Sequence, residues 1–174
     1  MVALALAFAL SASADTTTVG DPQGDNVGGT LDLKSATAGH TSTGKLKHTV
    51  VQYNRLDQSN LPAVVMDAPK YGCQYGYEVW PAFNATKIYE PCTGNLVCCY
   101  TTSFPDAKTV VYKFPKSAIG SPGKYYWAIR IYGGGEANID VIPNRGNPHA
   151  VCPGTVSAGV CNSGWEQWMV LHRL

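Results

Sequence analysis

Two aspartates, Asp21 and Asp25, flank the short run Pro-Gln-Gly near the start of the chain. Carboxylate and backbone carbonyl oxygens on a tight loop are the ligands that hard divalent cations such as Ca²⁺ prefer. Because Ca²⁺ takes about six to eight oxygen ligands, two carboxylates would need partners from elsewhere in the chain. The alternative is that both side chains accept hydrogen bonds from backbone N–H groups of the turn and bind no ion.

A second set of candidate residues is aromatic: four surround Cys73 and two lie near the C-terminus, namely Tyr71, Tyr75, Tyr77, Trp80, Trp165 and Trp168. Sugar rings present C–H faces that stack on Tyr and Trp, so an exposed row of these rings would bind a polysaccharide or a cell-surface glycan. Tyr75 and Tyr77 share one face of an expected strand, whereas Trp80 has the opposite parity and would face the core. The alternative is that most of these rings are core residues.

The chain has six cysteines: Cys73, Cys92, Cys98, Cys99, Cys152 and Cys161. An even number in an exported protein indicates a disulfide framework. Cys152 and Cys161 stand apart from the others and are expected to pair, which would staple a loop and contribute about 2–3 kcal/mol. Neighbouring cysteines rarely bond to each other. The other four therefore leave two pairings open: Cys73–Cys98 with Cys92–Cys99, or Cys73–Cys99 with Cys92–Cys98.

The N-terminus predicts export. Residues 2–10 are an unbroken apolar run, and small residues at Ala12 and Ala14 follow it in the pattern that a signal peptidase accepts. We therefore expect residues 1–14 to be a signal peptide, residues 15–174 to be one domain, and the protein to be secreted. The run is shorter than the roughly 20 apolar residues of a membrane span, and no later segment approaches that length. The alternative is a buried N-terminal strand or helix, since no Lys or Arg precedes the run.

Composition excludes several classes of protein. With 13 basic and 12 acidic residues, the net charge is +1, so no basic excess favours nucleic-acid binding. The chain is 45% hydrophobic and only 14% charged, which argues against disorder and against a long coiled coil. No G-x-S-x-G sequence, catalytic cysteine motif or nucleotide-binding glycine pattern is present. A glycosidase would need two carboxylates about 5–9.5 Å apart, which spacing in the sequence cannot identify.

The rest of the sequence predicts short strands separated by turns. Residues 45–53 alternate most clearly, and Tyr125, Trp127, Ile129 and Ile131 share one face of residues 124–132. Further strands are expected at residues 31–36, 63–66, 75–81, 86–89, 96–102, 109–114 and 166–171, with one helical turn at residues 115–119. This pattern predicts an all-β antiparallel sandwich, jelly-roll or immunoglobulin-like, with long disulfide-stapled loops.

Several short motifs carry a resemblance. In order they are the D-P-x-G-D start, an L-D-L strand, a strand of L-x-H-T-V type, a Tyr-x-Trp strand and a late D-x-x-P. The matching residues are Asp21, Pro22, Gly24, Asp25, Asp32, Leu46, His48, Thr49, Val50, Trp127, Asp140 and Pro143. Together they resemble a group of secreted bacterial, actinobacterial-type β-sandwich proteins that are similar to DOMON domains and family-9 carbohydrate-binding modules. The six cysteines and residues 147–174 have no counterpart in that group.

The resemblance implies an extracellular binding or accessory module without its own chemistry. In this type of sandwich the first and last strands tend to be neighbours, which would bring Asp140 beside Asp21 and Asp25 as a third calcium ligand, with Asp32 a weaker candidate. No cofactor other than Ca²⁺ is expected.

We therefore expect a secreted, non-catalytic β-sandwich module that binds polysaccharide or cell-surface glycan and is stabilised by calcium. One alternative is a structural or adhesive extracellular subunit that self-associates by adding an edge strand to a neighbour. A second alternative is a small glycan-active enzyme.

Overall fold

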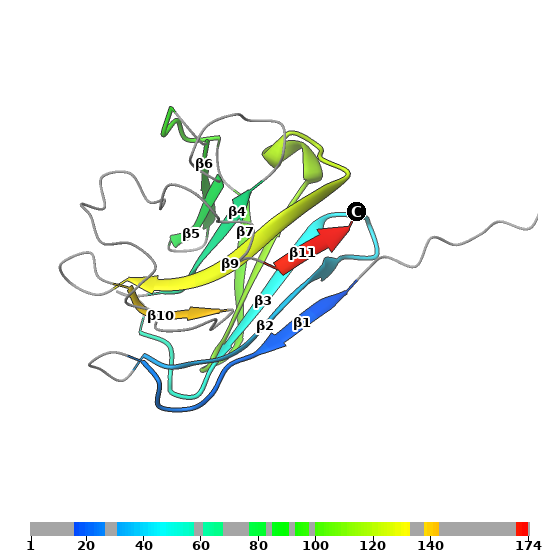
Figure 1. The fold of residues 1–174 in the computed structure, drawn as a ribbon. Coiled ribbons are helices and arrows are strands. Elements are labelled where there is room, and N and C mark those ends of the chain that lie inside the picture. The colour runs from blue at the N-terminus through cyan, green and yellow to red at the C-terminus, as the bar shows by residue number, and fades with distance from the viewer. Residues whose placement is uncertain are drawn as a thin grey trace, which may run out of the picture.

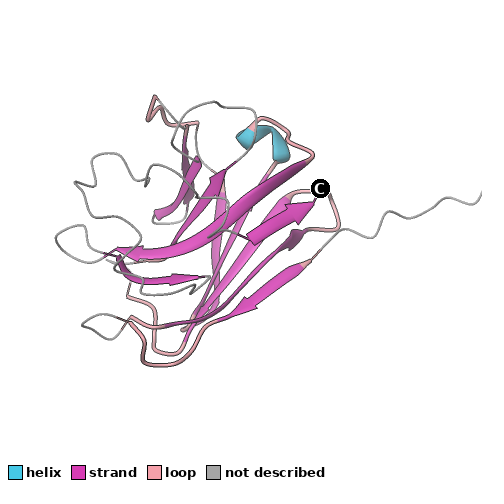
Figure 2. Cartoon of the chain, viewed as in Figure 1, coloured by secondary structure: helices cyan, strands magenta, loops and turns pink. Residues whose placement is uncertain are grey.

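Two antiparallel β-sheets face each other across an apolar interior (Figure 1). The structure is a computed structural model and describes residues 16–26, 31–57, 61–67, 77–82, 85–90, 93–97, 100–132, 138–142 and 170–173. Figure 2 shows that strands dominate this part of the chain. Its one helix is the 3-10 helix η1 (Lys116–Ile119), at the position of the predicted helical turn. The predicted all-β sandwich is confirmed at the level of its two sheets.

The first sheet has five strands in the order β1-β2-β3-β8-β7. Their bounds are β1 (Thr17–Gly20), β2 (Leu33–His40), β3 (Leu46–Gln52), β7 (Thr101–Asp106) and β8 (Thr109–Phe114). The second sheet has six strands, of which five follow the order β10-β9-β4-β5-β6 and β11 is a further partner of β9. Their bounds are β4 (Ala63–Asp67), β5 (Tyr77–Ala82), β6 (Ala85–Tyr89), β9 (Lys124–Tyr132), β10 (Asn138–Ile142) and β11 (Val170–Arg173).

Strands β10 and β11 share one edge of β9. β10 pairs with residues 129–132 and β11 with residues 124–127, whereas β4 pairs with residues 126–130 along the opposite edge. Strands that end at Ile142 and begin at Val170 thus have the same neighbour.

Side-chain alternation explains why these segments form strands. In β3, Leu46, His48, Val50 and Gln52 are buried and the residues between them are half-buried, as the predicted amphipathic strand requires. In β9, the predicted row of Tyr125, Trp127, Ile129 and Ile131 is buried in the core. Strands β1 and β10 were not predicted.

One polar pair lies inside the core. The His48 ring nitrogen Nε2 lies 2.8 Å from the Tyr125 hydroxyl, and both side chains are fully buried. The His48 ring also stacks parallel to Phe114, with 6.1 Å between ring centroids, and meets Trp127 edge-on. His48, one of the residues that carries the resemblance, is therefore a core residue that links the two sheets.

Polar side chains join the sheets at two places. At one edge the hydroxyls of Thr86 and Thr102 lie 2.7 Å apart, beside an isolated bridge between Thr86 and Tyr100. At the other, the Leu33 N–H of β2 donates to Asp140 Oδ2 of β10 over 2.5 Å. The second contact brings the start of the sandwich beside its end, which is where the predicted cation site lies.

Several predictions fall outside the described residues. They are the signal peptide at residues 1–14, the six cysteines (Cys73, Cys92, Cys98, Cys99, Cys152 and Cys161) and the loops that their disulfides would staple. Within the described ranges, no helix has the length and apolar character that crossing a bilayer would require.

Candidate metal centre

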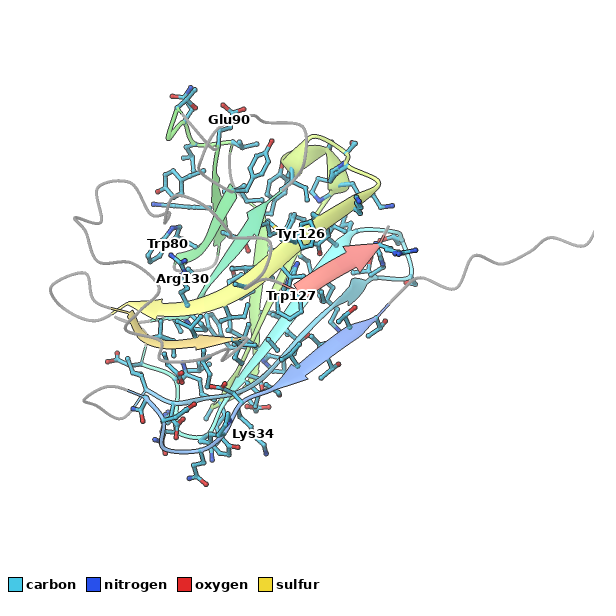
Figure 3. All side chains as sticks on the ribbon, in the orientation of Figure 1. Lys34, Trp80, Glu90, Tyr126, Trp127 and Arg130 are labelled. Atoms are coloured by element: carbon cyan, nitrogen blue, oxygen red, sulfur yellow. The ribbon has the colours of Figure 1, made fainter. Side chains whose placement is uncertain are left out.

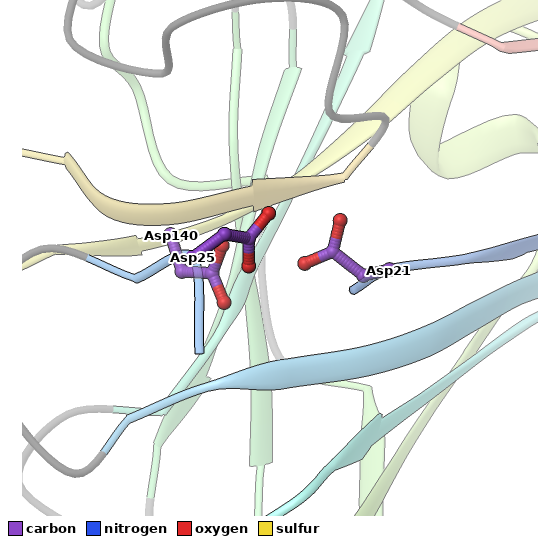
Figure 4. Close-up of side chains that lie close together, drawn as sticks. All are labelled: Asp21, Asp25 and Asp140. Carbon is purple, nitrogen blue, oxygen red and sulfur yellow. The ribbon is translucent and has the colours of Figure 1, made fainter. Parts of the chain in front are cut away.

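Three aspartates converge at the edge where β2 meets β10. Asp21 follows β1, Asp25 ends the turn after it, and Asp140 lies within β10. One carboxylate oxygen from each lies within 4.8 Å of the other two, and Figure 4 shows Asp21 facing the pair formed by Asp25 and Asp140. Ligand oxygens on opposite sides of a Ca²⁺ ion, each about 2.4 Å from it, are also about 4.8 Å apart. The three oxygens are therefore close enough to share one ion.

Backbone hydrogen bonds fix the position of Asp140. Its side chain is 1% exposed. Oδ2 accepts the Leu33 N–H, and Oδ1 accepts the N–H of Val141 over 2.8 Å. Each oxygen keeps a second lone pair, so Asp140 can bind a cation without losing either hydrogen bond.

Asp21 is held by its backbone, and its carboxylate remains available. The Asp21 N–H donates to the Lys34 carbonyl over 2.9 Å, and the Tyr53 hydroxyl donates to the Asp21 carbonyl over 3.0 Å. The side chain is 6% exposed, and no donor among the described residues reaches either carboxylate oxygen. A buried carboxylate without donors is costly unless a proton or a cation compensates its charge.

The turn that carries Asp25 depends on a glycine. Gly24 has a φ of 84°, in the left-handed region that residues with a Cβ rarely adopt. The Gly24 N–H donates to Asp32 Oδ2 over 2.9 Å, which ties the turn to the residue before β2. The D-P-x-G-D sequence therefore forms a closed turn that presents both of its aspartates to the same point.

The crowding of acidic groups changes their protonation. Burial, followed by the negative charges of Asp140 and Asp25, raises the pKa of Asp21 to about 8. A hydrogen bond to Asp140, which forms only when Asp21 carries a proton, acts in the same direction. Burial also raises the pKa of Asp140 to about 6, against the opposing effect of its two backbone hydrogen bonds. The cluster thus favours a proton or a cation over a full set of negative charges.

Two of the six aromatic residues that were predicted to bind sugar lie in the described part of the chain, Tyr77 and Trp80. Tyr77 is 2% exposed and belongs to the core, because it pairs with Met66 on the inward face of β4. The prediction that Tyr77 belongs to an exposed row is therefore wrong. Trp80 (Figure 3) is half-buried and lies on the opposite face of β5, so the expected parity of these two residues is reversed. Tyr71, Tyr75, Trp165 and Trp168 lie outside the described residues.

Sequence reasoning missed two supports of the site. Tyr53 fixes the Asp21 carbonyl from the end of β3, and the Lys34 ammonium lies 5.8 Å from the centre of the Tyr53 ring. Neither residue has a type or a spacing that points to a cation site, because each acts on the backbone or on a ring rather than on the ion.

Comparison with known proteins returned no matching family model, no matching curated protein and no matching solved structure.

Proposed function

We propose that this chain is a secreted, non-catalytic β-sandwich binding module that is stabilised by a Ca²⁺ ion bound between Asp21, Asp25 and Asp140. The observation that supports the ion most strongly is the buried Asp21 carboxylate, which has no donor and lies within 4.8 Å of two further carboxylates. Its charge needs compensation, and a divalent cation supplies it while binding all three side chains.

The ligand type favours calcium over other metals. All three side chains offer oxygen, which hard cations prefer, whereas zinc and copper favour nitrogen and sulfur. Mg²⁺ demands near-ideal octahedral geometry and retains several waters, while Ca²⁺ accepts irregular sets of carboxylates and carbonyls. Ligands drawn from a turn and a strand form such an irregular set.

Calorimetric titration of the chelator-stripped chain with Ca²⁺ tests this proposal. We expect one site with a Kd of about 10⁻⁴–10⁻³ M, as in other extracellular modules. Asp25→Ala should weaken or abolish the binding heat. Asp106→Asn, which changes an exposed aspartate at the end of β7, serves as the matched control and should bind as the unmodified chain does. A silent titration, with no change in melting temperature, would remove the site.

The closed environment of these carboxylates argues against a glycosidase site at this cluster. Two neighbouring carboxyl groups with raised pKa values resemble a glycosidase pair. With Asp21 6% and Asp140 1% exposed, however, a sugar ring cannot reach them, whereas a single ion can.

For the glycan ligand we propose the outward face of the β5–β6 hairpin. Trp80 pairs with Lys87 across these strands, and Tyr89 lies two residues further along β6 on the same face. All three side chains are half-buried, in contrast to the buried Ile88 between them. Diagonal neighbours of this kind lie about 7–8 Å apart, so the two rings can contact one sugar chain while the lysine reaches its hydroxyl groups.

Replacing these rings tests the glycan surface. We expect Trp80→Ala and Tyr89→Ala to lower retention on insoluble polysaccharide at least fivefold, because each removes a stacking face without disturbing the core. Phe104→Ala, which removes an exposed ring from β7 of the other sheet, should retain full binding. Equal retention by all three variants would exclude this face.

We further infer that the sandwich is immunoglobulin-like rather than a jelly roll. The order β2-β3-β8-β7 against β10-β9-β4-β5-β6 follows the strand order A-B-E-D against G-F-C-C′-C″ of variable-type immunoglobulin domains, with β1 added before strand A. Many unrelated binding modules share this order, so it supports the class of fold and leaves the ligand to the surface.

A further inference from the structure

We infer that Asp32 is a fourth acidic residue of the calcium site. It does not bind the ion directly but accepts a hydrogen bond from a water molecule that is bound to the ion. This inference rests on the proposed calcium site and adds a positioning residue to it.

The burial and contacts of Asp32 carry the argument. The side chain is 4% exposed, and its two oxygens differ. Oδ2 accepts the Gly24 N–H over 2.9 Å, whereas Oδ1 is buried and has no hydrogen-bond partner in the described part of the chain. A buried carboxylate oxygen without a donor costs free energy, so Oδ1 needs a group that the described residues do not supply.

Asp32 is also held next to the turn of the cluster. Its bond to Gly24 places one oxygen at the turn between Asp21 and Asp25. The N–H of the next residue, Leu33, donates to Asp140 Oδ2, so the backbone that carries Asp32 also lies against Asp140. Asp32 is thus a separate buried carboxylate held beside the residues that carry the other three.

The distances assign Asp32 to the outer position. Among the described residues, the acidic side chains whose oxygens all lie within 4.8 Å of one another are Asp21, Asp25 and Asp140, and Asp32 is not among them. Direct ligands of one Ca²⁺ ion meet this limit, because about twice the Ca–O distance separates even opposite ligands. A carboxylate oxygen outside this set is suited to accept a hydrogen bond from a water ligand, and outer residues of this kind commonly tune metal affinity.

The test combines calcium titration with Eu³⁺ luminescence, whose decay rates in H₂O and D₂O count the water molecules on the bound ion. In Asp32→Asn, the amide oxygen still accepts the Gly24 N–H, while the NH₂ group replaces the free acceptor. We expect calcium affinity to fall about 10- to 100-fold while the number of bound waters stays the same. In Asp25→Ala, which removes a direct ligand, the number of bound waters should rise by about one.

The outcomes separate the possible roles. If Asp32→Asn adds a bound water, Asp32 is a direct ligand and the outer role is overturned. If its calcium affinity equals that of the unmodified chain, Asp32 only shapes the turn, and the inference again fails while the calcium site stands. If the unmodified chain binds neither Ca²⁺ nor Eu³⁺, the proposed function fails and this inference fails with it. The melting temperature of metal-free Asp32→Asn should not fall, because the Gly24 hydrogen bond is kept and a like charge is removed.

Discussion

Adding 10 mM Ca²⁺ to the chelator-stripped chain is expected to raise its melting temperature by about 5–10 °C. For a Kd of about 10⁻⁴ M this concentration is about 100-fold above Kd, which adds about 2.7 kcal/mol of stability. A domain of this size gains about 2–4 °C for each kcal/mol. The physical reason is that the ion relieves repulsion among Asp21, Asp25 and Asp140 only in the folded chain, where they converge. Differential scanning calorimetry at constant ionic strength measures the shift.

Asp140→Ala is the variant that tests the calcium-dependent rise in melting temperature most directly. It removes a ligand and also leaves the Leu33 and Val141 N–H groups without their acceptor, so the calcium-dependent shift should disappear and the metal-free chain should also melt earlier. Asp106→Asn should retain the full shift. An equal rise with NaCl, or a full calcium shift in Asp140→Ala, would contradict the proposed site.

The second large effect is an unusual pH dependence. In the metal-free chain, stability should fall as the pH rises from about 4 to about 8. The folded-state pKa values of Asp21, about 8, and Asp140, about 6, lie above the ordinary value of 3.8. The folded chain therefore holds protons that the unfolded chain releases. This contribution to stability is fully present below the unfolded-state value and is lost as the pH rises through the folded-state values.

Calcium should reverse this trend, because the ion competes with protons for the same oxygens. Urea unfolding at pH 5 and pH 8, in metal-free buffer and in 10 mM Ca²⁺, gives the four values that are needed. We expect the metal-free chain to be more stable at pH 5, and the gain from calcium to be larger at pH 8. A metal-free chain that is more stable at pH 8, together with a gain that does not change with pH, would show that the cluster does not control stability.

The sequence was sufficient for features that depend on local pattern. Alternation placed β3 and β9 with their buried faces, and the turn chemistry of D-P-x-G-D placed Asp21 and Asp25 together. The sequence pattern did not predict strand β10, because Asp140 occupies a core-facing position two residues before Ile142. A charged residue there breaks the apolar alternation by which a strand is recognised.

The aromatic surface shows what local pattern cannot decide. Both faces of β5 carry an aromatic ring, Tyr77 inward and Trp80 outward, so alternation in the sequence does not show which face is buried. Pairing with β4 decides which face of β5 is buried. Tyr77 lies opposite Met66 and Val79 lies opposite Val64, and these two residues of β4 belong to the core. Parity in such a strand is a tertiary property, since a shift by one residue would exchange the two faces.

The bond between Leu33 and Asp140 joins residues 107 positions apart, which bears on when the proposed cation site can form. During synthesis the N-terminal turn emerges long before β10, so a nascent or truncated chain that stops before Asn138 lacks one of the three oxygens. Contacts of such long range form late, because the loop they close is costly in entropy. An ion held by all three carboxylates could therefore bind only after β10 has been made and has come to lie beside β2.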